Sequence, residues 1–301
     1  MSYITIIGVG IDGIDAVNQM VNKRMSNDEV SFLICDTDEV ILQKPLIENK
    51  ILIPYETDNN RFLSVEAQTK FKSRLEDVRI VFLVAAMGDR AGSDILPELV
   101  DYCHDLGIKV FCLVSSSFAS KDEMIGKIAE NSIMAIRKCA DNVVVVNNDF
   151  ILEPDNNIIP VNEFRKSSQA LAELCNELYR LLCAPKYISL DTEDIYRFFD
   201  NSAITIIASG YSNDSNRIIS GFDNALESPA FTSHKIGDID KIICEFQCSS
   251  QHQLGTDDVE CIHEIMKQRI NEKTSFIWHA SFNEELNEKI KVIIFANINK
   301  H

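Results

Sequence analysis

Positive charge is scarce in this sequence. Its 301 residues include 29 Lys and Arg but 46 Asp and Glu, which gives a formal net charge of −17 at pH 7. Such an acidic chain repels other polyanions, so nucleic acid and anionic membrane surfaces are poor partners for it. Long apolar runs are also absent, which argues against a transmembrane helix, and because the first predicted strand begins at Tyr3 we expect no signal peptide.

Cysteine and histidine lack the spacing that marks metal or redox sites. The nine cysteines form no Cys-x-x-Cys pair, and several lie inside apolar runs, among them Cys35, Cys112 and Cys244. Reduced core cysteines of this kind are typical of a cytoplasmic protein. The six histidines show no metal-ligand spacing, and no Ser-His-Asp order stands out. We therefore predict a cytoplasmic protein with no resident metal site and no catalytic triad.

Strands and helices alternate regularly in the first half of the chain. Short apolar runs suited to buried strands cover residues 3–9, 32–35, 50–53, 80–86, 109–115 and 142–146. Segments with helical periodicity lie between them, at residues 10–23, 64–76, 93–106 and 121–139. This alternation predicts an α/β fold with a doubly wound parallel sheet.

The pattern changes after residue 149. One long helix is predicted over 161–183, because apolar residues recur near a 3.6 period until Pro185 stops it. A smaller α/β unit follows, with strands at 203–209, 242–248, 275–281 and 289–297 and helices at 191–200, 216–226 and 257–271. We therefore predict a nucleotide-binding-type domain at 1–160, a central helix at 161–185 and a second domain at 186–301.

A glycine-bearing turn follows the first predicted strand. Gly8-x-Gly10-x-x-Gly13 leads from that strand into a helix, and Asp36 ends the second strand, where an acid can accept a ribose hydroxyl. One interpretation of this arrangement is an NAD-binding oxidoreductase, although the motif alone does not identify the ligand. The alternative is that the glycines merely allow a tight turn between strand and helix.

A second turn, over 87–94, follows the strand at 80–86, and a dinucleotide fingerprint does not explain it. A strand that delivers a glycine-bearing turn to a helix N-terminus can hold phosphate on backbone N–H groups. Here Gly88 and Gly92 are present, but Asp89 and Asp94 place carboxylates where an anion would dock. Only Arg90 offsets them, so the turn is poorly suited to phosphate.

Taken in order, these motifs resemble FtsZ, the bacterial division protein of the tubulin superfamily, over nearly the whole chain. The matching segments are 8–18, Asp36-Thr37-Asp38, 86–97, Asn148-Asp149, 188–194 and 225–229. The resemblance implies a polymerising GTPase of cell division that binds GTP or GDP, with Mg²⁺ when GTP is bound. It implies nucleotide contacts from Gly8, Gly10, Gly13, Gly88, Gly92, Ser93 and Asn148.

The acidic segment at 188–194 resembles the synergy loop of that family. There, two acids of one subunit position the attacking water at the nucleotide of the next, and the matching residues here are Asp191 and Asp194. The same two residues also fit a variant of a helix capping box. Both interpretations remain open, and Ser189 in place of the family's asparagine weakens the catalytic one.

Every loop that would touch GTP departs from the family pattern. Side chains stand where the family has glycine at Ile11, Ile14, Asp89, Arg90 and Asp94, and they fill space that phosphate needs. The glycine-rich third loop is missing from 55–65, Phe150 replaces an arginine, and Ser168 replaces the aspartate that reads guanine. Aspartates would also crowd one mouth and repel a triphosphate, namely Asp12, Asp15, Asp36, Asp38, Asp89 and Asp94.

We therefore predict an FtsZ-like filament protein with a degenerate GTP site and weak or no GTPase activity, which acts mainly by association with itself or with a true FtsZ. One alternative is a divergent, active GTPase that polymerises with GTP. Another is the NAD-binding oxidoreductase, for which no catalytic residue set is found. Because the family's membrane anchors bind a C-terminal peptide and the chain stops close to its last predicted strand, we expect no direct membrane binding.

Overall fold

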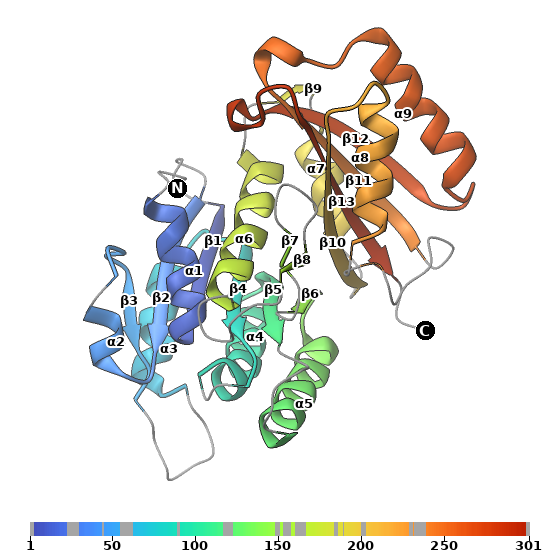
Figure 1. Cartoon of the computed structure of the whole chain (residues 1–301). Coiled ribbons are helices and arrows are strands. Elements are labelled where there is room, and N and C mark those ends of the chain that lie inside the picture. Colours follow the sequence, from blue (N-terminus) through green and yellow to red (C-terminus); the bar gives the residue numbers. More distant parts are fainter. Residues whose placement is uncertain are drawn as a thin grey trace. The chain divides into compact units, whose positions relative to one another are not determined.

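The chain divides into two compact units. A computed structural model describes residues 3–22, 30–43, 45–54, 63–88, 91–116, 123–147, 151–152, 158–159, 167–183, 186–188, 190–199, 203–228, 231 and 239–298. Unit 1 comprises Met1–Asp149 with Val161–Tyr179, and unit 2 comprises Phe150–Pro160 with Arg180–His301. The elements of both units are labelled in Figure 1.

Unit 1 is built on a parallel sheet with strand order β3-β2-β1-β4-β5-β6. The strands are β1 Ile4–Val9, β2 Val30–Asp36, β3 Lys50–Leu52, β4 Ile80–Ala86, β5 Lys109–Ser116 and β6 Asn142–Asn147. Every residue of β1 and β4 is buried, as the continuous apolar runs require in a sheet covered on both faces. The predicted doubly wound parallel sheet is confirmed.

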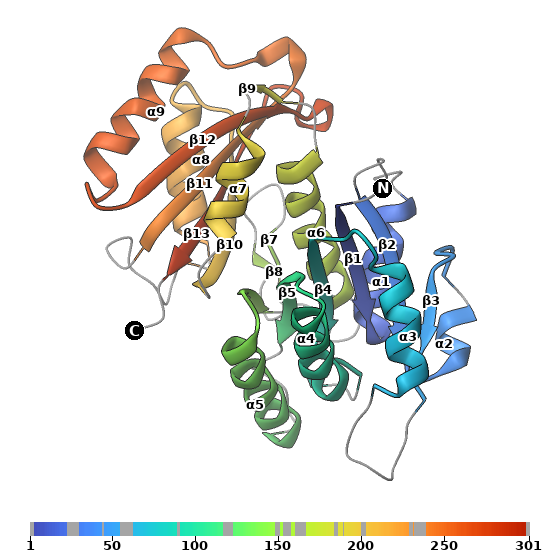
Figure 2. The ribbon, with the colours of Figure 1, turned by 180° about the vertical axis from the view of Figure 1, so that it is seen from behind.

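Helices cover both faces of this sheet. They are α1 Gly10–Asn22, α2 Glu39–Gln43, α3 Val65–Arg74, α4 Leu96–Asp105, α5 Glu123–Cys139 and α6 Ser167–Cys183, the last of which runs on into unit 2. Buried side chains of α3, α4 and α5 form one core with alternate strand residues such as Ile7, Leu83 and Cys112. Figure 1 shows α1 on the near side of the sheet, and Figure 2 shows α3 and α4 on the other.

Unit 2 has a mixed sheet with strand order β10-β13-β11-β12-β9. Its elements are β9 Lys186–Ile188, α7 Thr192–Phe199, β10 Ala203–Ser212, α8 Arg217–Leu226, β11 Ile239–Cys248, α9 Thr256–Arg269, β12 Ser275–Phe282 and β13 Ile290–Ile298. Strand β13 is antiparallel to β10 and β11, β11 is parallel to β12, and β9 is antiparallel to β12. A small antiparallel pair joins β7 Ile151–Leu152 and β8 Ile158–Ile159.

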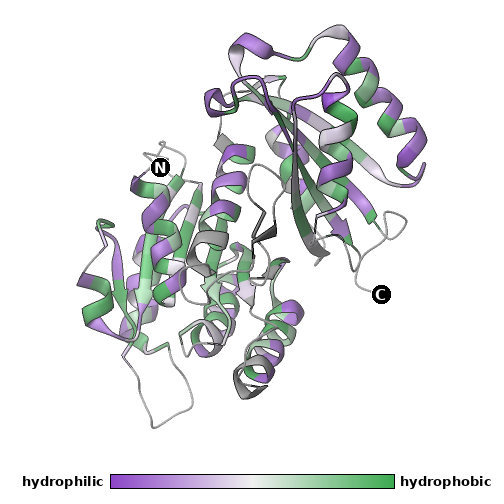
Figure 3. Ribbon diagram, in the orientation of Figure 1, coloured by the Kyte–Doolittle hydropathy of each residue, from purple (hydrophilic) through white to green (hydrophobic). Residues whose placement is uncertain are grey.

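The hydropathy of the residues differs between the strands and the helices. Figure 3 shows strands that are largely green, whereas the helices carry purple on one side and green on the other, because only one stripe of each helix faces a core. The core of unit 2 gathers residues of α8, α9 and one sheet face, among them Phe222, Phe246 and Ile262. Within the described residues, no helix is both long and apolar enough to cross a bilayer.

The predicted elements differ from the observed ones mainly at their ends. The helix predicted at 93–106 begins as a π-helical turn, η1 Ala91–Ile95, before α4. Of the helix predicted at 161–183, the first residues lie outside the described part of the chain. The short elements α2 and β9 were not predicted, since five and three residues carry little periodicity.

Helix α1 sits unusually close to β4. A Cβ atom placed on Gly13 would lie 2.1 Å from the carbonyl oxygen of Val84, which no real contact allows. The third glycine of the first motif therefore exists to let helix and strand backbones meet.

We expect Gly13→Ala to lower the free energy of unfolding by about 1–3 kcal/mol or more, because α1 must move away from β4. Denaturant titration followed by circular dichroism measures this. Gly255→Ala is the matched control, because its new Cβ would meet only Asp258 Oδ2, at 3.9 Å. Equal denaturation midpoints for the two variants would contradict this close seating of α1.

Candidate functional site

The two glycine-bearing turns meet at one edge of the unit 1 sheet. Strands β1 and β4 are parallel neighbours with Val9 opposite Ala85, so the turns that follow them leave the sheet side by side. The strand order also reverses direction here, between β2-β1 and β4-β5. In open α/β sheets, ligands bind at such a switch point, outside the carboxyl ends of the strands.

Glycine is required at one position in each turn. Gly10 has φ 72° and Gly88 has φ 106°, both in a region that side chains other than glycine rarely adopt. Gly8 and Gly13 are different, because a Cβ on Gly8 would lie 2.7 Å from the Gly13 carbonyl oxygen. Gly8 and Gly13 allow the backbone of α1 to pack closely against strands β1 and β4, whereas Gly10 and Gly88 give the two turns their backbone conformation.

The second turn is closed by its own side chain. The Gly88 N–H donates a hydrogen bond to Ser93 Oγ over 3.0 Å, and Ser93 is buried. The preceding N–H, of Met87, donates to the Ser115 carbonyl oxygen at 2.8 Å. Two backbone donors at the start of this turn therefore already have acceptors within the protein.

Asp36, which the sequence analysis placed with five other aspartates at one mouth, is buried. The side chain is only 3% exposed, and its Oδ1 accepts the Asp38 N–H at 2.9 Å. Burial raises the pKa of this carboxyl above its ordinary value. Asp38 in turn accepts the Val40 N–H at 2.8 Å, so both acids serve to start α2. A ribose hydroxyl would find the Asp36 carboxylate already enclosed.

The other side chains expected at this edge lie in different environments. Ile11, in the first turn of α1, is 53% exposed, whereas Ile14 is fully buried and packs in the core. Asp15 is exposed, and Asp94 is half-buried within η1. Gly92 is buried in the same turn. Asp89, Arg90, Asn148, Phe150 and Ser189 lie outside the described residues, as does the 55–62 part of the third loop.

In unit 2, Asp191 caps helix α7. Its Oδ1 accepts the Glu193 N–H at 3.0 Å, and its carbonyl oxygen accepts the N–H groups of Asp194 and Ile195 at 3.1 and 3.3 Å. Asp191 is exposed and Asp194 is half-buried in the first turn. Asp191 therefore caps α7, as one of the two interpretations predicted. Its carboxylate remains exposed to solvent.

Two residues that the sequence analysis did not single out hold the other end of α7. Lys241 Nζ donates to the Arg197 carbonyl oxygen at 2.7 Å, and Asn297 Nδ2 donates to that of Phe198. Helix carbonyls at a C-terminus have no partner within the helix, so these bonds satisfy groups that would otherwise be open. No local sequence signal marks either residue, because both lie on distant strands.

Among the described residues, no group of three or more His, Cys, Asp and Glu side chains is arranged to hold a metal ion. The described cysteines are free thiols, most of them buried.

Comparison with known proteins agrees with this architecture. The family model described as "Tubulin/FtsZ family, GTPase domain" matches residues 3–155. This chain therefore belongs to the Tubulin/FtsZ family, and the resemblance inferred from its motifs is confirmed.

Similar proteins cover nearly the whole chain. Cell division protein FtsZ of Porphyromonas gingivalis is 25% identical over 98% of this chain and 66% of its own length. Cell division protein FtsZ 1 of Pyrococcus horikoshii is 23% identical over 97% of this chain and 80% of its own length. The chain thus spans about two thirds of the first relative and four fifths of the second.

Solved structures share the fold at lower identity. An empty FtsZ dimer from M. jannaschii has a TM-score of 0.83 at 19% identity, covering 99% of this chain and 88% of that one. The GTPγS-bound protofilament of CetZ2 from Haloferax volcanii has a TM-score of 0.75 at 16% identity, covering 100% and 94%.

We expect Asp36→Asn to stabilise the protein, increasingly so as the pH rises. The folded pKa of Asp36 lies above its unfolded value, so the folded state loses stability as the pH rises through the folded pKa. Asparagine removes this loss and keeps an oxygen for the Asp38 N–H. Thermal midpoints of variant and parent between about pH 4 and pH 8 test this. Asp15→Asn, at an exposed position, is the control. A difference in thermal midpoint between Asp36→Asn and the parent that shrinks with rising pH would contradict the expectation.

Proposed function

We propose that this protein is an FtsZ-like cytoskeletal protein of cell division whose GTP site is lost or strongly weakened, and that it acts mainly through protein association. The hydrogen bond from the Gly88 N–H to Ser93 Oγ carries this proposal. A phosphate-binding turn presents its N–H groups outwards to the anion. Here the turn uses this donor to close on itself.

The free energy of phosphate binding is reduced by this arrangement. An incoming phosphate would have to displace the Ser93 hydroxyl, at a net cost of about 0.5–1.5 kcal/mol for the lost bond. Asp94, half-buried in the same turn, adds like-charge repulsion of a few kcal/mol for a close pair at an effective dielectric near ~20. The exposed Ile11 adds an apolar side chain beside the first turn of α1. Together these terms oppose a triphosphate.

Association is supported by the structural neighbours. One is an FtsZ dimer described as empty, and another is a CetZ2 protofilament. In the proposed contact, the exposed start of α7, with Asp191 and Asp194, meets the switch-point edge of a second copy or of a conventional FtsZ. Because both faces carry acids, a partner with a less acidic edge binds better than a second copy.

A divergent, active GTPase is the second candidate. Gly10 and Gly88 keep the backbone shape of nucleotide turns, and the capped Asp191 carboxylate stays exposed. Family membership and the enclosed Asp36 carboxylate remove support from the dinucleotide oxidoreductase. Nucleotide binding separates the two remaining candidates.

The purified protein should carry no GDP, and calorimetric titration with GTP·Mg²⁺ should give a dissociation constant above about 1 mM, a binding free energy weaker than about −4 kcal/mol. Replacing Asp89, Arg90 and Asp94 together by glycine should improve the affinity only modestly, because Ile11 and the Ser93 bond remain. Micromolar affinity of the unmodified protein would favour the active GTPase instead.

Sedimentation should show weak self-association that is the same with and without GTP. Asp191→Ala with Asp194→Ala should weaken it up to about fivefold, the worth of one exposed ion pair to Arg90 of a second copy, because the loss of this attraction exceeds the screened repulsion that the same change removes. Glu260→Ala with Glu264→Ala, two exposed acids of α9, removes the same charge and serves as the control. The proposal would be refuted by filaments that form only with GTP and that are abolished by Asp191→Ala with Asp194→Ala. That result would favour the active GTPase instead.

A further inference from the structure

The geometry points to Tyr187 as a positioning residue, which fastens the segment bearing Asp191 and Asp194 to the sheet of unit 2. The role of these acids in association rests on the proposed function. The fastening itself is a property of unit 2 and can be tested separately.

Strand β9 needs a side-chain anchor. It is three residues long and lies at the edge of the sheet, with only Ile188 opposite Ala280 and Lys186 opposite Ser281 on β12. So short an edge pairing holds a segment weakly, because few backbone hydrogen bonds oppose its fraying. The loop that leads to Asp191 follows this strand directly.

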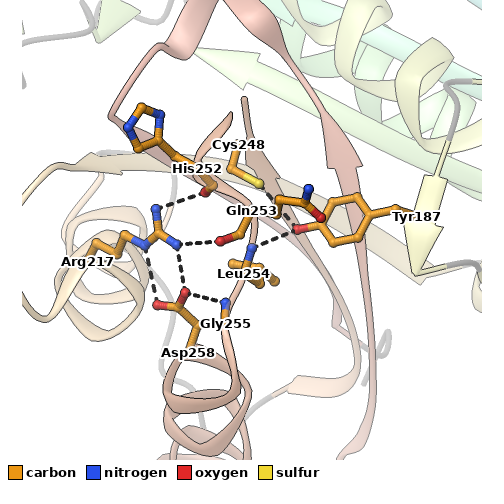
Figure 4. A network of polar contacts seen from close by, with 8 residues as sticks. All are labelled: Tyr187, Arg217, Cys248, His252, Gln253, Leu254, Gly255 and Asp258. Carbon is orange, nitrogen blue, oxygen red and sulfur yellow. Dashed lines mark hydrogen bonds and ion pairs between the residues drawn. The ribbon is translucent and has the colours of Figure 1, made fainter. Parts of the chain in front are cut away.

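Tyr187 reaches from β9 across β12 to the end of β11. Its ring stacks on Phe282 at a centroid distance of 4.5 Å and an angle of 17°. Its hydroxyl lies 3.2 Å from Cys248 Sγ and accepts a long bond, 3.4 Å, from the Leu254 N–H. Figure 4 shows the hydroxyl between these two groups.

Leu254 is a fixed point because its neighbours are clamped. Gln253 offers its carbonyl oxygen to Arg217 Nη2 at 3.1 Å, and the Gly255 N–H donates to Asp258 Oδ2 at 2.9 Å. Arg217 and Asp258 close the clamp with two contacts, Nε to Oδ1 at 3.3 Å and Nη2 to Oδ2 at 2.6 Å (Figure 4). Tyr187 thus docks on a loop that a paired-charge contact between α8 and α9 holds in place.

The protonation states suit this arrangement. Burial raises the pKa of the Tyr187 phenol and of the Cys248 thiol, so both keep their protons at neutral pH. A neutral phenol can accept from Leu254 and still share its proton with sulfur. Burial alone would raise the pKa of Asp258, but the hydrogen bonds from Arg217 and from the Gly255 N–H, together with the charge of Arg217, outweigh burial and lower this pKa, so the carboxyl stays ionised.

The far end of the segment is held independently. Lys241 and Asn297 bind the last carbonyls of α7, and Thr205 Oγ1 fixes Asn297 by donating to its Oδ1 at 2.5 Å. Asp191 and Asp194 therefore lie between two anchors, Tyr187 before them and the end of α7 after them. Loosening the first anchor frees the loop while the second keeps the helix on the sheet.

Tyr187→Phe tests the hydroxyl, because the phenyl ring keeps its stacking on Phe282. Hydrogen–deuterium exchange of the full chain should become roughly three- to tenfold faster in peptides covering 186–195, the factor that one net hydrogen bond gives. Exchange in unit 1 should not change. Tyr211→Phe is the matched control, since Tyr211 lies on β10, which β13 and β11 separate from β12 and β9, with its ring facing Lys291. Unchanged exchange at 186–195 in Tyr187→Phe would overturn the inference.

The association assay then asks whether Tyr187 acts through the two acids. Tyr187→Phe should weaken association in the parent but add nothing in the Asp191→Ala, Asp194→Ala background. An equal loss in both backgrounds would overturn the positioning role. If removing the acids leaves association unchanged, the proposed contact fails, and the exchange result still decides the fastening.

Discussion

The parallel pairing of β1 with β4 is the constraint on which unit 1 depends. It places two turns, separated by about half of unit 1 in sequence, at one edge of the sheet, and it sets the gap into which α1 must fit. The helices of both faces pack on a sheet whose central strands, β1 and β4, are buried throughout. Whatever this edge binds, the location follows from that pairing rather than from the loops.

Polar groups at the candidate sites are largely used by the protein itself. Ser93 closes the second turn, Asp36 and Asp38 start α2, and Asp191 starts α7. Each of these contacts is local, and each satisfies a backbone N–H group of the same turn or helix start. A site whose donors are already paired gains less from an anion than one that keeps them open. This pairing of backbone donors within the protein is the basis of our proposal that the chain acts mainly through protein contacts.

Prediction from sequence succeeded where the signal was local or long. The strand at 80–86 was placed to the residue, because a continuous apolar run leaves few choices. The cap at Asp191 could also be recognised, since capping acts within one helical turn. The burial of Asp36 could not, because a residue at a strand end can point inwards or outwards. Nor could the anchors of the acidic segment be predicted, because Tyr187, Lys241 and Asn297 find their partners on distant elements.

The close packing of α1 on β4 affects how a Gly-x-Gly-x-x-Gly pattern in a sequence can be interpreted. Gly8 and Gly13 are held by the close approach of helix and strand backbones, whether or not any nucleotide is bound. Two of the three glycines of the Gly-x-Gly-x-x-Gly pattern are therefore required by packing, and a match to this pattern does not by itself show that a nucleotide is bound.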